Sequence, residues 1–346
     1  MARAISPVAD AVALVALARE LRRLRPDIVH THASKAGILG RAAARLAGRH
    51  GRCQVSGVRE RPDSGIDSTQ SPNLPISPFP NSLPVLHTPH TFYFQGCAGV
   101  KRRIFRRFEA LALPLTRRLV LLSEGQARLA REEFGVAMPP YSVIENGVDT
   151  QRFAPGDRAA ARRELGLPRD VPVIGTIMRF LPQKDPDTLA VGLLRSLVAR
   201  PEAHALIVGD GPLLARALET LRPVAARVHR LPDTDRPEAI YPALDVFALS
   251  SRYEGMPYTL LEGMACGVPC VVPRISGCAE VVEDGRTGLL TAPGDPGALA
   301  RGLMALLDDA ELRHRLGVAA RAVAAERFPL RRFVARMTEL YEQSVY

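Results

Sequence analysis

SRYEGMPYTLLEGMACGVPCVV, residues 251–272, contains two glutamates, Glu254 and Glu262, eight positions apart. Glu254 lies in a loop marked by glycine and proline, and the apolar run after it predicts a helix that begins near Tyr258. Glu262 would then occupy the first or second turn of this helix, close to Glu254. Free N–H groups and a partial positive charge at a helix N-terminus stabilise a carboxylate, which can accept hydrogen bonds from a sugar diol. The structural alternatives are a residue that merely pairs with the helix dipole for Glu262 and a solvated loop acid for Glu254.

Apolar runs on either side of this stretch indicate a parallel sheet covered by helices. Runs of strand length alternate with helical or loop segments throughout the second half of the chain, which is typical of Rossmann-like domains. These runs are residues 171–177, 203–209, 226–231, 245–250, 269–272 and 287–291. Ligands of such sheets bind at the carboxyl ends of the strands.

The first half shows a similar pattern with a polar interruption. An amphipathic helix precedes a short strand at 28–29, a second helix ends at Gly48, and order resumes at residue 85. Residues 49–84 are rich in Pro, Ser, Gly and Asn, which predicts a loop or disordered insertion. We expect two α/β domains, residues 1–148 and 149–346, facing each other across a cleft, with a last helix at about 328–343 that can cross back to the first domain.

Composition narrows the class of protein. The chain has 346 residues, 47% apolar and 24% charged, as in a soluble globular protein, and no apolar run approaches the roughly 20 residues of a membrane span. A net charge of +10 indicates an anionic partner, but with 5% aromatic residues and no nucleic-acid motif we expect no nucleic acid. Five scattered cysteines favour a reducing cytoplasm and give no zinc-site spacing.

Two further strand-end loops carry candidate ligand contacts. Arg179 and Lys184, five positions apart in IMRFLPQKD, could both reach one diphosphate, or they are two solvated charges. Gly209 and Gly211 flank an aspartate in a turn that opens a helix. They would let a ligand approach the backbone closely, or serve only a tight turn.

Taken together, these motifs resemble the family 4 glycosyltransferases with the GT-B fold. The pattern EGMPYTLLE matches their E-x7-E motif, and IENGVDTQRFAP, RFLPQK, VGDGPLL and LEGMACGVPCVVPRISGCAEVVEDGRTGLL follow the family's order. The resemblance covers about residues 20–48 and 85–330. It implies two Rossmann-like domains, a nucleotide-sugar donor in the second domain and an acceptor in the first. It also implies retention of anomeric configuration without a metal or other cofactor.

The resemblance implies a role for each matched residue of the second domain. Arg179 and Lys184 would hold the donor diphosphate, with Gly209 and Gly211 in the next loop. Glu262 would bind the ribose hydroxyls, and Glu254 would act at the transferred sugar. The backbone of Gly255, Met256 and Pro257 would assist Glu254. A UDP-sugar is the favoured donor.

The first domain would hold a saccharide or polyprenyl-linked acceptor. In HTPHTFYF, His90 is favoured over His87 as the histidine near the reacting sugar, with Thr91 beside it. A histidine packed against a strand is the alternative. HTHASKAG, with His32 and Lys35, is typical of a subgroup that makes surface or exopolysaccharide. Lys35 is a weaker candidate for an acceptor phosphate, and a surface lysine explains it equally well.

The segment KRRIFRRFEALALPL predicts a basic amphipathic helix. We expect its apolar stripe to contain Ile104, Phe105, Phe108, Leu111 and Leu115. Such a helix can lie on an anionic membrane, or it can pack on the core with a solvated basic face. A cytoplasmic protein in peripheral contact with the inner face of the plasma membrane would suit a lipid-linked acceptor.

Three departures from the family pattern shape the alternatives. The first strands and their glycine-rich loop are expected to be missing, the insertion at 49–84 displaces a strand position, and SGCAE replaces the usual loop before the predicted helix with Glu280. Cys278 in this loop could narrow the sugar-phosphate pocket. The competing functions are a sugar-nucleotide epimerase of the same fold and an inactive truncated chain that still binds nucleotide.

Overall fold

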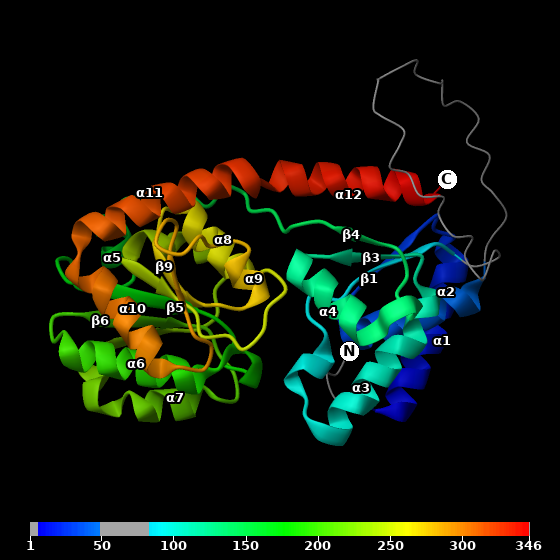
Figure 1. The fold of residues 1–346 in the computed structure, drawn as a ribbon, viewed down its shortest axis with the longest axis horizontal. Coiled ribbons are helices and arrows are strands. Elements are labelled where there is room, and N and C mark those ends of the chain that lie inside the picture. The colour runs from blue at the N-terminus through cyan, green and yellow to red at the C-terminus, as the bar shows by residue number, and fades with distance from the viewer. Residues whose placement is uncertain (1–5, 49–82, 346) are drawn as a thin grey trace, which may run out of the picture.

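The computed structural model describes residues 6–48 and 83–345, which form two α/β domains side by side (Figure 1). The first domain contains α1 (Pro7–Leu24), β1 (Val29–His32), α2 (Ser34–Ala47), β2 (Val85–Thr88), the short 3-10 helix η2 (Tyr93–Gly96), α3 (Gly99–Ala112), β3 (Arg118–Leu121), α4 (Glu124–Phe134) and β4 (Tyr141–Val143).

The second domain and the final helices follow from residue 158. They are α5 (Arg158–Glu164), β5 (Val173–Ile177), α6 (Pro186–Ala199), β6 (His204–Val208), α7 (Leu214–Thr220), β7 (Val228–Leu231), β8 (Val246–Ala248), α8 (Tyr258–Ala265), β9 (Cys270–Pro273), α9 (Ser276–Ala279), β10 (Leu289–Thr291), α10 (Pro296–Asp308), α11 (Ala310–Arg327) and α12 (Leu330–Val345).

The first sheet has the order β1-β2-β3-β4, and every pair of neighbouring strands is parallel. Its strands are short apolar runs, and β1 is an edge strand in the part of the chain that the structure describes. Most of the predicted insertion, residues 49–82, lies outside the described residues. The insertion was nevertheless predicted too long, because Leu83 is 5% exposed and packs with Ala44 and Val85 in the core.

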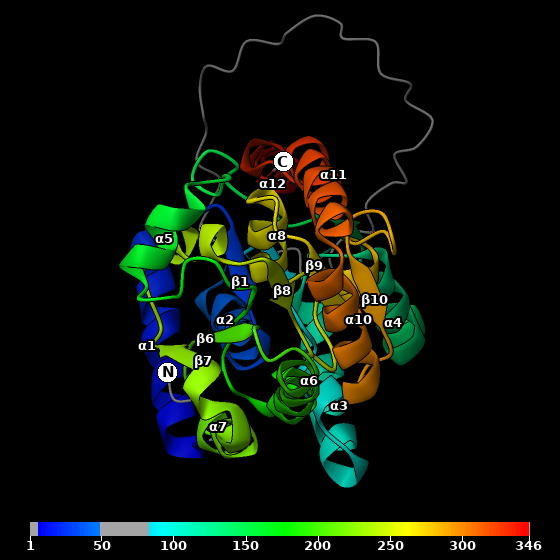
Figure 2. The same ribbon diagram turned by 90° about the vertical axis from the view of Figure 1, so that its left-hand side faces the viewer.

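The second sheet has the order β10-β9-β8-β5-β6-β7 and is also entirely parallel. Successive strand residues face opposite layers of helices. Val173, Leu206 and Phe247 belong to a core cluster with residues of α8 and α11, whereas Ile174 and Ile207 belong to one with residues of α6, α7 and α10. Burial on both faces explains why these strands read as continuous apolar runs. Figure 2 shows the sheet between the two layers.

The chain crosses between the domains twice at the same place. The segment after β4 enters the second domain, and α11 and α12 return along the top of the molecule (Figure 1). At the crossing, Val148 donates its N–H to the Phe328 carbonyl, and Leu330 donates to the Val148 carbonyl. Met337 and Leu340 of α12 then pack against the first sheet.

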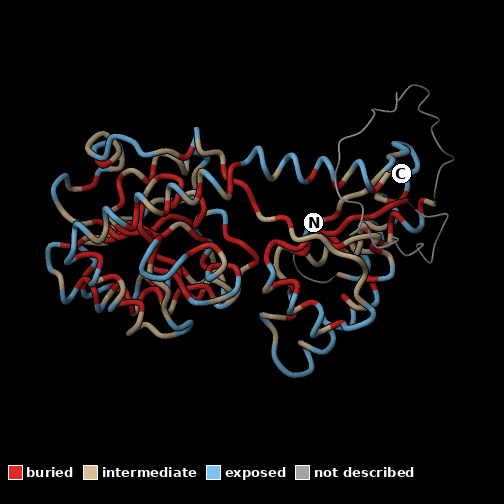
Figure 3. Tube along the Cα trace, turned by 45° about the horizontal axis from the view of Figure 1, so that its top comes forward, coloured by how far each residue is buried: buried red, intermediate tan, exposed pale blue. Residues whose placement is uncertain are grey.

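Burial follows this architecture (Figure 3). Buried residues are concentrated in the centre of each domain, and exposed residues lie along the outer helices. Of the described helices, none combines the length and apolar character needed to cross a membrane.

Candidate active site

A cavity of about 460 Å³ lies between the two domains. Its walls come from loops at the carboxyl ends of strands in both sheets, the usual ligand position in parallel α/β sheets. The lining residues are His90, Thr91, Leu122, Asn146, Ile177, Met178, Arg179, Gln183, Lys184, Gly209, Asp233 and residues 254–259. The structure therefore brings together all the predicted site residues except Lys35, Gly211 and Glu262.

Lys184 and Glu254 form an ion pair in the cavity wall. The Lys184 Nζ lies 2.5 Å from Glu254 Oε1, and the two side chains are 16% and 7% exposed. The Ser251 hydroxyl donates to the same carboxylate oxygen at 2.6 Å. Glu254 is therefore not a solvated loop acid. Because a lysine ammonium has three N–H donors, Lys184 can hold Glu254 and an incoming anion together.

Arg179 provides a second cation in the same wall. Its side chain is exposed to the cavity, and within the described part of the chain it takes part in no ion pair. The loop around it is fixed by backbone hydrogen bonds, including one from the Phe180 N–H to the Asp210 carbonyl at 2.9 Å. Arg179 therefore presents an uncompensated positive charge from a defined loop, beside the paired charge of Lys184.

The glycines of the Gly-Asp-Gly turn are required by packing against this loop. Gly209 has a φ of +116°, and a Cβ at this position would lie 2.1 Å from the Met178 carbonyl oxygen. A Cβ at Gly211, whose φ is +151°, would lie 2.7 Å from the Phe180 carbonyl oxygen. Only Gly209 lines the cavity. Both glycines therefore support the Arg179 loop, and Gly209 also forms part of the cavity surface.

Glu262 lies in the second turn of α8 and is not among the residues that line the cavity. Its carboxylate accepts a hydrogen bond from the Tyr241 hydroxyl at 2.7 Å. Burial raises the pKa of Glu262, and the hydrogen bond from Tyr241 opposes this shift. Tyr258 and Thr259, one turn earlier in the same helix, do line the cavity. A ligand would therefore contact the start of α8 before it reaches the Glu262 carboxylate.

His90 lines the cavity from the first domain, opposite the residues of the second domain, and it has a strained backbone conformation. Its φ is +57°, a region that residues other than glycine rarely occupy. The His90 carbonyl accepts a hydrogen bond from Gln126 Nε2 at 3.0 Å. It also packs against Gly255 of the second domain, where a Cβ would lie 1.9 Å from the His90 oxygen. Strain of this kind is common at functional sites, where the surrounding structure maintains it.

Two further histidines lie beside His90. His32 Nδ1 is 3.1 Å from His90 Nε2, and the His32 ring also contacts the His30 ring, with centroids 4.2 Å apart. His30 is hydrogen-bonded to Thr88 Oγ1 at 2.9 Å and to the Tyr341 hydroxyl of α12 at 2.7 Å. Burial lowers the pKa of all three histidines, that of His30 to about 3, so the cluster is neutral at pH 7.

This histidine cluster borders a second cavity of about 370 Å³ beneath α12. The two cavities share His90, Leu122, Asn146 and Tyr258, so they meet at the histidine that the sequence favoured. His87, the alternative, is fully buried and hydrogen-bonded to Thr31, with its ring against Gly37. It contacts neither cavity.

Lys35 lines neither cavity in the structure. Its Nζ lies 2.7 Å from Asp10 Oδ1, and the two side chains are partly exposed. A structural ion pair between α1 and the start of α2 therefore explains this lysine in the described structure.

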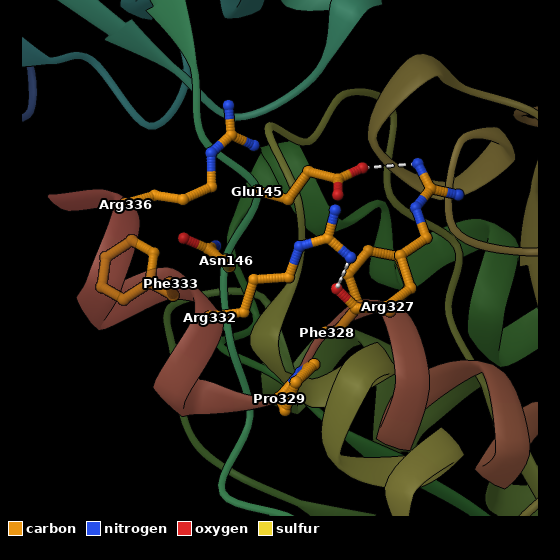
Figure 4. A pocket seen from close by; sticks show the side chains of 8 residues that line it. All are labelled: Glu145, Asn146, Arg327, Phe328, Pro329, Arg332, Phe333 and Arg336. Carbon is orange, nitrogen blue, oxygen red and sulfur yellow. Dashed lines mark hydrogen bonds and ion pairs between the residues drawn. The ribbon is translucent and has the colours of Figure 1, made fainter. Parts of the chain in front are cut away.

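Asn146, which was not among the predicted site residues, joins the two domains. It is 2% exposed, donates from Nδ2 to the Met256 carbonyl at 2.8 Å, and accepts from the Tyr258 hydroxyl at 3.1 Å. Beside it, Glu145 pairs with Arg327 at the crossing (Figure 4). The hollow shown there measures about 10 Å³, room for a single water rather than a substrate. The crossing is therefore a structural junction.

The loop around Cys278 and Glu280 also differs from expectation. Cys278 is fully buried in the core of the second domain, so it does not narrow the cavity as proposed from the sequence. Glu280 follows the short helix α9 and reaches the other domain. Its carboxylate accepts backbone hydrogen bonds from Glu124 and Gly125 at the start of α4, each at 2.7 Å. No local sequence signal indicated this contact between domains.

Comparison with known proteins places both domains of the chain among glycosyltransferases. Residues 1–147 match the family described as glycosyl transferase 4-like domain, and residues 171–309 match glycosyl transferases group 1. The chain is 32% identical over 322 residues to the UDP-Gal:alpha-D-GlcNAc-diphosphoundecaprenol alpha-1,3-galactosyltransferase of Escherichia coli. That alignment covers 89% of this chain and 73% of the relative.

Other curated relatives are matched over a smaller part of their length. The chain is 34% identical over 221 residues to a GDP-mannose-dependent monoacylated alpha-(1-6)-phosphatidylinositol monomannoside mannosyltransferase of Corynebacterium glutamicum, covering 59% of this chain and 56% of that protein. It is 32% identical over 267 residues to the D-inositol 3-phosphate glycosyltransferase of Nocardia farcinica, covering 70% and 58%. The chain thus spans little more than half of these two proteins.

Solved structures show the same fold at low sequence identity. Anabaena HepE in complex with UDP-glucose aligns with a TM-score of 0.74 at 20% identity, over 95% of this chain and 82% of HepE. The sucrose-phosphate synthase of Thermosynechococcus elongatus aligns with a TM-score of 0.74 at 21% identity, over 95% and 76%. Two parallel-sheet α/β domains with a cavity between them therefore have the GT-B fold. This chain belongs to the family 4 glycosyltransferases, and the fold class predicted from the sequence is confirmed.

Proposed function

We propose that this enzyme transfers a sugar from a UDP-sugar to a saccharide carried on a polyprenyl diphosphate, with retention of anomeric configuration. The observation that carries the proposal is the cationic wall of Arg179 and Lys184 facing His90 across the interdomain cavity. The relative from Escherichia coli supports the donor and the acceptor, because its name specifies UDP-galactose and a diphosphoundecaprenol-linked sugar. The inositol- and phosphatidylinositol-directed relatives make other acceptors the competing outcome.

The chemistry of the leaving group explains the cations. Departure of a nucleoside diphosphate builds negative charge in the transition state, and preorganised positive groups stabilise that charge most effectively in a site that excludes water. Arg179 would contribute a planar fork of donors and Lys184 a point charge. The enzyme would therefore need no metal or other cofactor for this step. Full activity in the presence of a chelator is the expected result, and activity that returns only with added Mg²⁺ or Mn²⁺ would reject this part.

The second domain would bind the donor through the residues assigned from the sequence. Arg179 and Lys184 would hold the diphosphate, and the start of α8 with Glu262 would bind the ribose. Glu254 and the backbone of Gly255, Met256 and Pro257 would contact the transferred sugar. Glu254 is already oriented by Lys184 and Ser251, so its carboxylate would be in place before the donor arrives.

The first domain would provide the acceptor side, with His90 and Thr91 at the reacting sugar. Because a lipid-linked acceptor lies in a bilayer, we also place the enzyme in the cytoplasm, in peripheral contact with the inner face of the plasma membrane.

The donor assignment is tested by calorimetry of the full chain with UDP, GDP and ADP. The acceptor is tested by transfer from UDP-sugars to a short-chain polyprenyl-diphosphate saccharide. We expect UDP to bind most tightly, Lys184→Ala and Glu262→Ala each to weaken binding several-fold, and nuclear magnetic resonance to show the donor's anomeric configuration in the product. Unchanged UDP binding in both variants rejects the site, and an inverted product rejects retention. Conversion of a UDP-sugar to its epimer without an acceptor would establish the epimerase instead.

A further inference from the structure

Helix α3 exposes an apolar stripe that no other described element covers. Val100, Ile104, Phe108 and Leu111 are 62%, 48%, 48% and 67% exposed. They are spaced four, four and three residues apart, so they lie on one side of the helix. Four large apolar side chains in one exposed row form a contiguous patch, which marks an interaction surface rather than an ordinary solvated face.

This stripe differs from the one expected from the sequence. Phe105 is turned inward and packs on Tyr93, with ring centroids 4.5 Å apart. Leu115 lies beyond the end of α3, in a 3-10 turn, so it does not extend the stripe. Val100 belongs to the observed stripe instead, because the helix begins at Gly99 and therefore includes Val100. The apolar stripe therefore faces outward rather than toward the core.

The charges on either side of the stripe are all positive. Lys101, Arg103 and Arg107 are exposed, and within the described residues none of them takes part in an ion pair. Arg102 and Arg106, on the side of the helix that faces α4, pair with Glu133 of that helix. The one acidic residue of α3, Glu109, is buried against Arg41 at 2.6 Å. No carboxylate of the helix itself therefore offsets the positive charge beside the stripe.

Helix α3 is connected to the candidate active site by a short, packed segment. It lies at the lower end of the first domain in Figure 2 and extends below the other labelled elements. Eight residues separate His90 from Gly99, and η2 within this segment contacts the other domain. A Cβ at Gly96 would lie 2.2 Å from the hydroxyl oxygen of Tyr253, the residue that precedes Glu254. A surface that receives α3 would therefore lie close to the acceptor side of the cavity.

We infer that α3 is the membrane-docking face of this enzyme, with Val100, Ile104, Phe108 and Leu111 inserted into the interface of an anionic bilayer. Lys101, Arg103 and Arg107 would contact its phosphate headgroups. An apolar stripe flanked by unpaired cations matches the two components of an anionic lipid surface, apolar chains beneath a negative layer. The inference rests on the proposed transfer to a lipid-linked acceptor. It adds the surface by which the enzyme reaches that acceptor.

The test is flotation of the full-length protein with vesicles of phosphatidylcholine, with and without phosphatidylglycerol. We expect binding to the anionic vesicles only. Ile104→Ser combined with Phe108→Ser should weaken it roughly ten-fold or more, and Arg103→Gln combined with Arg107→Gln by a similar factor. The control is Val8→Ser combined with Val12→Ser, which removes from α1 two apolar side chains that are even more exposed, at 78% and 65%, and should leave binding unchanged.

Each outcome has a distinct meaning. Calorimetry with UDP on every variant shows that the cavity is intact, so lost flotation with normal UDP binding supports α3 docking. Failure of the unmodified protein to bind anionic vesicles overturns the inference, as does equal loss in the α1 control. A dimer in vesicle-free solution that the Ile104/Phe108 variant converts to a monomer would assign the stripe to a second copy instead. Vesicle binding by a protein that transfers no sugar would reject the proposed function but leave α3 as the docking face.

Discussion

Glu280 of the second domain caps helix α4 of the first, where its carboxylate accepts the backbone N–H of Gly125 at 2.7 Å. The adjacent N–H of Glu124 donates to the other carboxylate oxygen at the same distance. A helix N-terminus carries unsatisfied donors and partial positive charge, so a carboxylate from another domain is a favourable partner. The contact links the domain that would bind the donor to the loop after β3, beside the histidine side of the cavity.

The first prediction concerns this interdomain cap. Glu280→Ala should cost about 1 kcal/mol of stability, the usual value of a lost helix cap, and should shift the molecule toward a more open domain arrangement. Small-angle scattering without ligand checks the opening, and thermal unfolding checks the cost. Glu283→Ala is the control, because among the described residues Glu283 forms its ion pair with the nearby Arg286 on the surface. Equal behaviour of the two variants would contradict a role for Glu280 in closure.

The second prediction separates the two cations of the cavity. Lys184→Ala should weaken UDP binding and also destabilise the fold by roughly 3 kcal/mol, because Glu254 is left with a buried, uncompensated charge. Arg179→Ala should weaken UDP binding with little change in stability, because Arg179 is exposed and unpaired in the described structure. Thermal unfolding and calorimetry on both variants check this difference.

A double variant controls for that interpretation. Glu254→Gln combined with Lys184→Met removes both charges, so most of the stability lost in Lys184→Ala should return while UDP binding stays weak. If the double variant remains as unstable as the single one, the loss arises from packing rather than from the unpaired carboxylate.

The third prediction concerns pH and His30. Burial, with smaller contributions from His32 and His90, lowers the pKa of His30 in the folded protein to about 3 from the ordinary 6.5. Between these values the unfolded chain binds the extra proton, so this residue makes stability fall as the pH drops through that window. His30→Gln should therefore show a shallower loss of melting temperature between about pH 7 and about pH 4. An identical pH slope in the variant and the unmodified protein would contradict it.

The fourth prediction concerns His32 as a positioning residue. His32 bonds to the ring of His90 but is absent from the lining of the larger cavity, so His32→Phe should lower kcat while leaving UDP affinity unchanged. His32→Asn keeps a polar group near His90 Nε2 and should recover part of the rate. A steady-state comparison of kcat and KM for donor and acceptor checks this. A large change in donor KM with an unaltered kcat would assign His32 to substrate binding instead.

The strands and helices of the second domain were predicted well because each is signalled by residues that are neighbours in the sequence. Strands buried on both faces produce continuous apolar runs, and α8 begins at Tyr258 as the motif indicated. The strand ends placed Arg179, Lys184 and Glu254 at one edge of the sheet, and the family resemblance assigned them to one site, which the shared cavity fits. Such features depend on neighbouring residues and on a rule of sheet topology, so a single sequence contains them.

Contacts between distant segments could not be predicted in this way. Glu280 reaches Gly125 across 155 positions, His32 reaches His90 across 58, and the buried Asn146 bonds to Met256 across 110. No periodicity records such pairs. The orientation of α3 was also only partly predicted, because Phe105 has the same hydropathy whether it packs on Tyr93 or faces solvent.

The paired crossings at Val148 and Pro329 also constrain how substrates can enter and leave. Two chain segments hydrogen-bonded side by side at one edge act as a hinge, so an opening motion rotates the domains about that edge. The space between the domains then widens least beside Asn146 and most on the side away from the hinge. A donor could be exchanged through a wide opening there, while the contacts that orient Tyr258 near the hinge change little. The position of the crossings thus favours a fixed inner end of the cavity and a variable outer one.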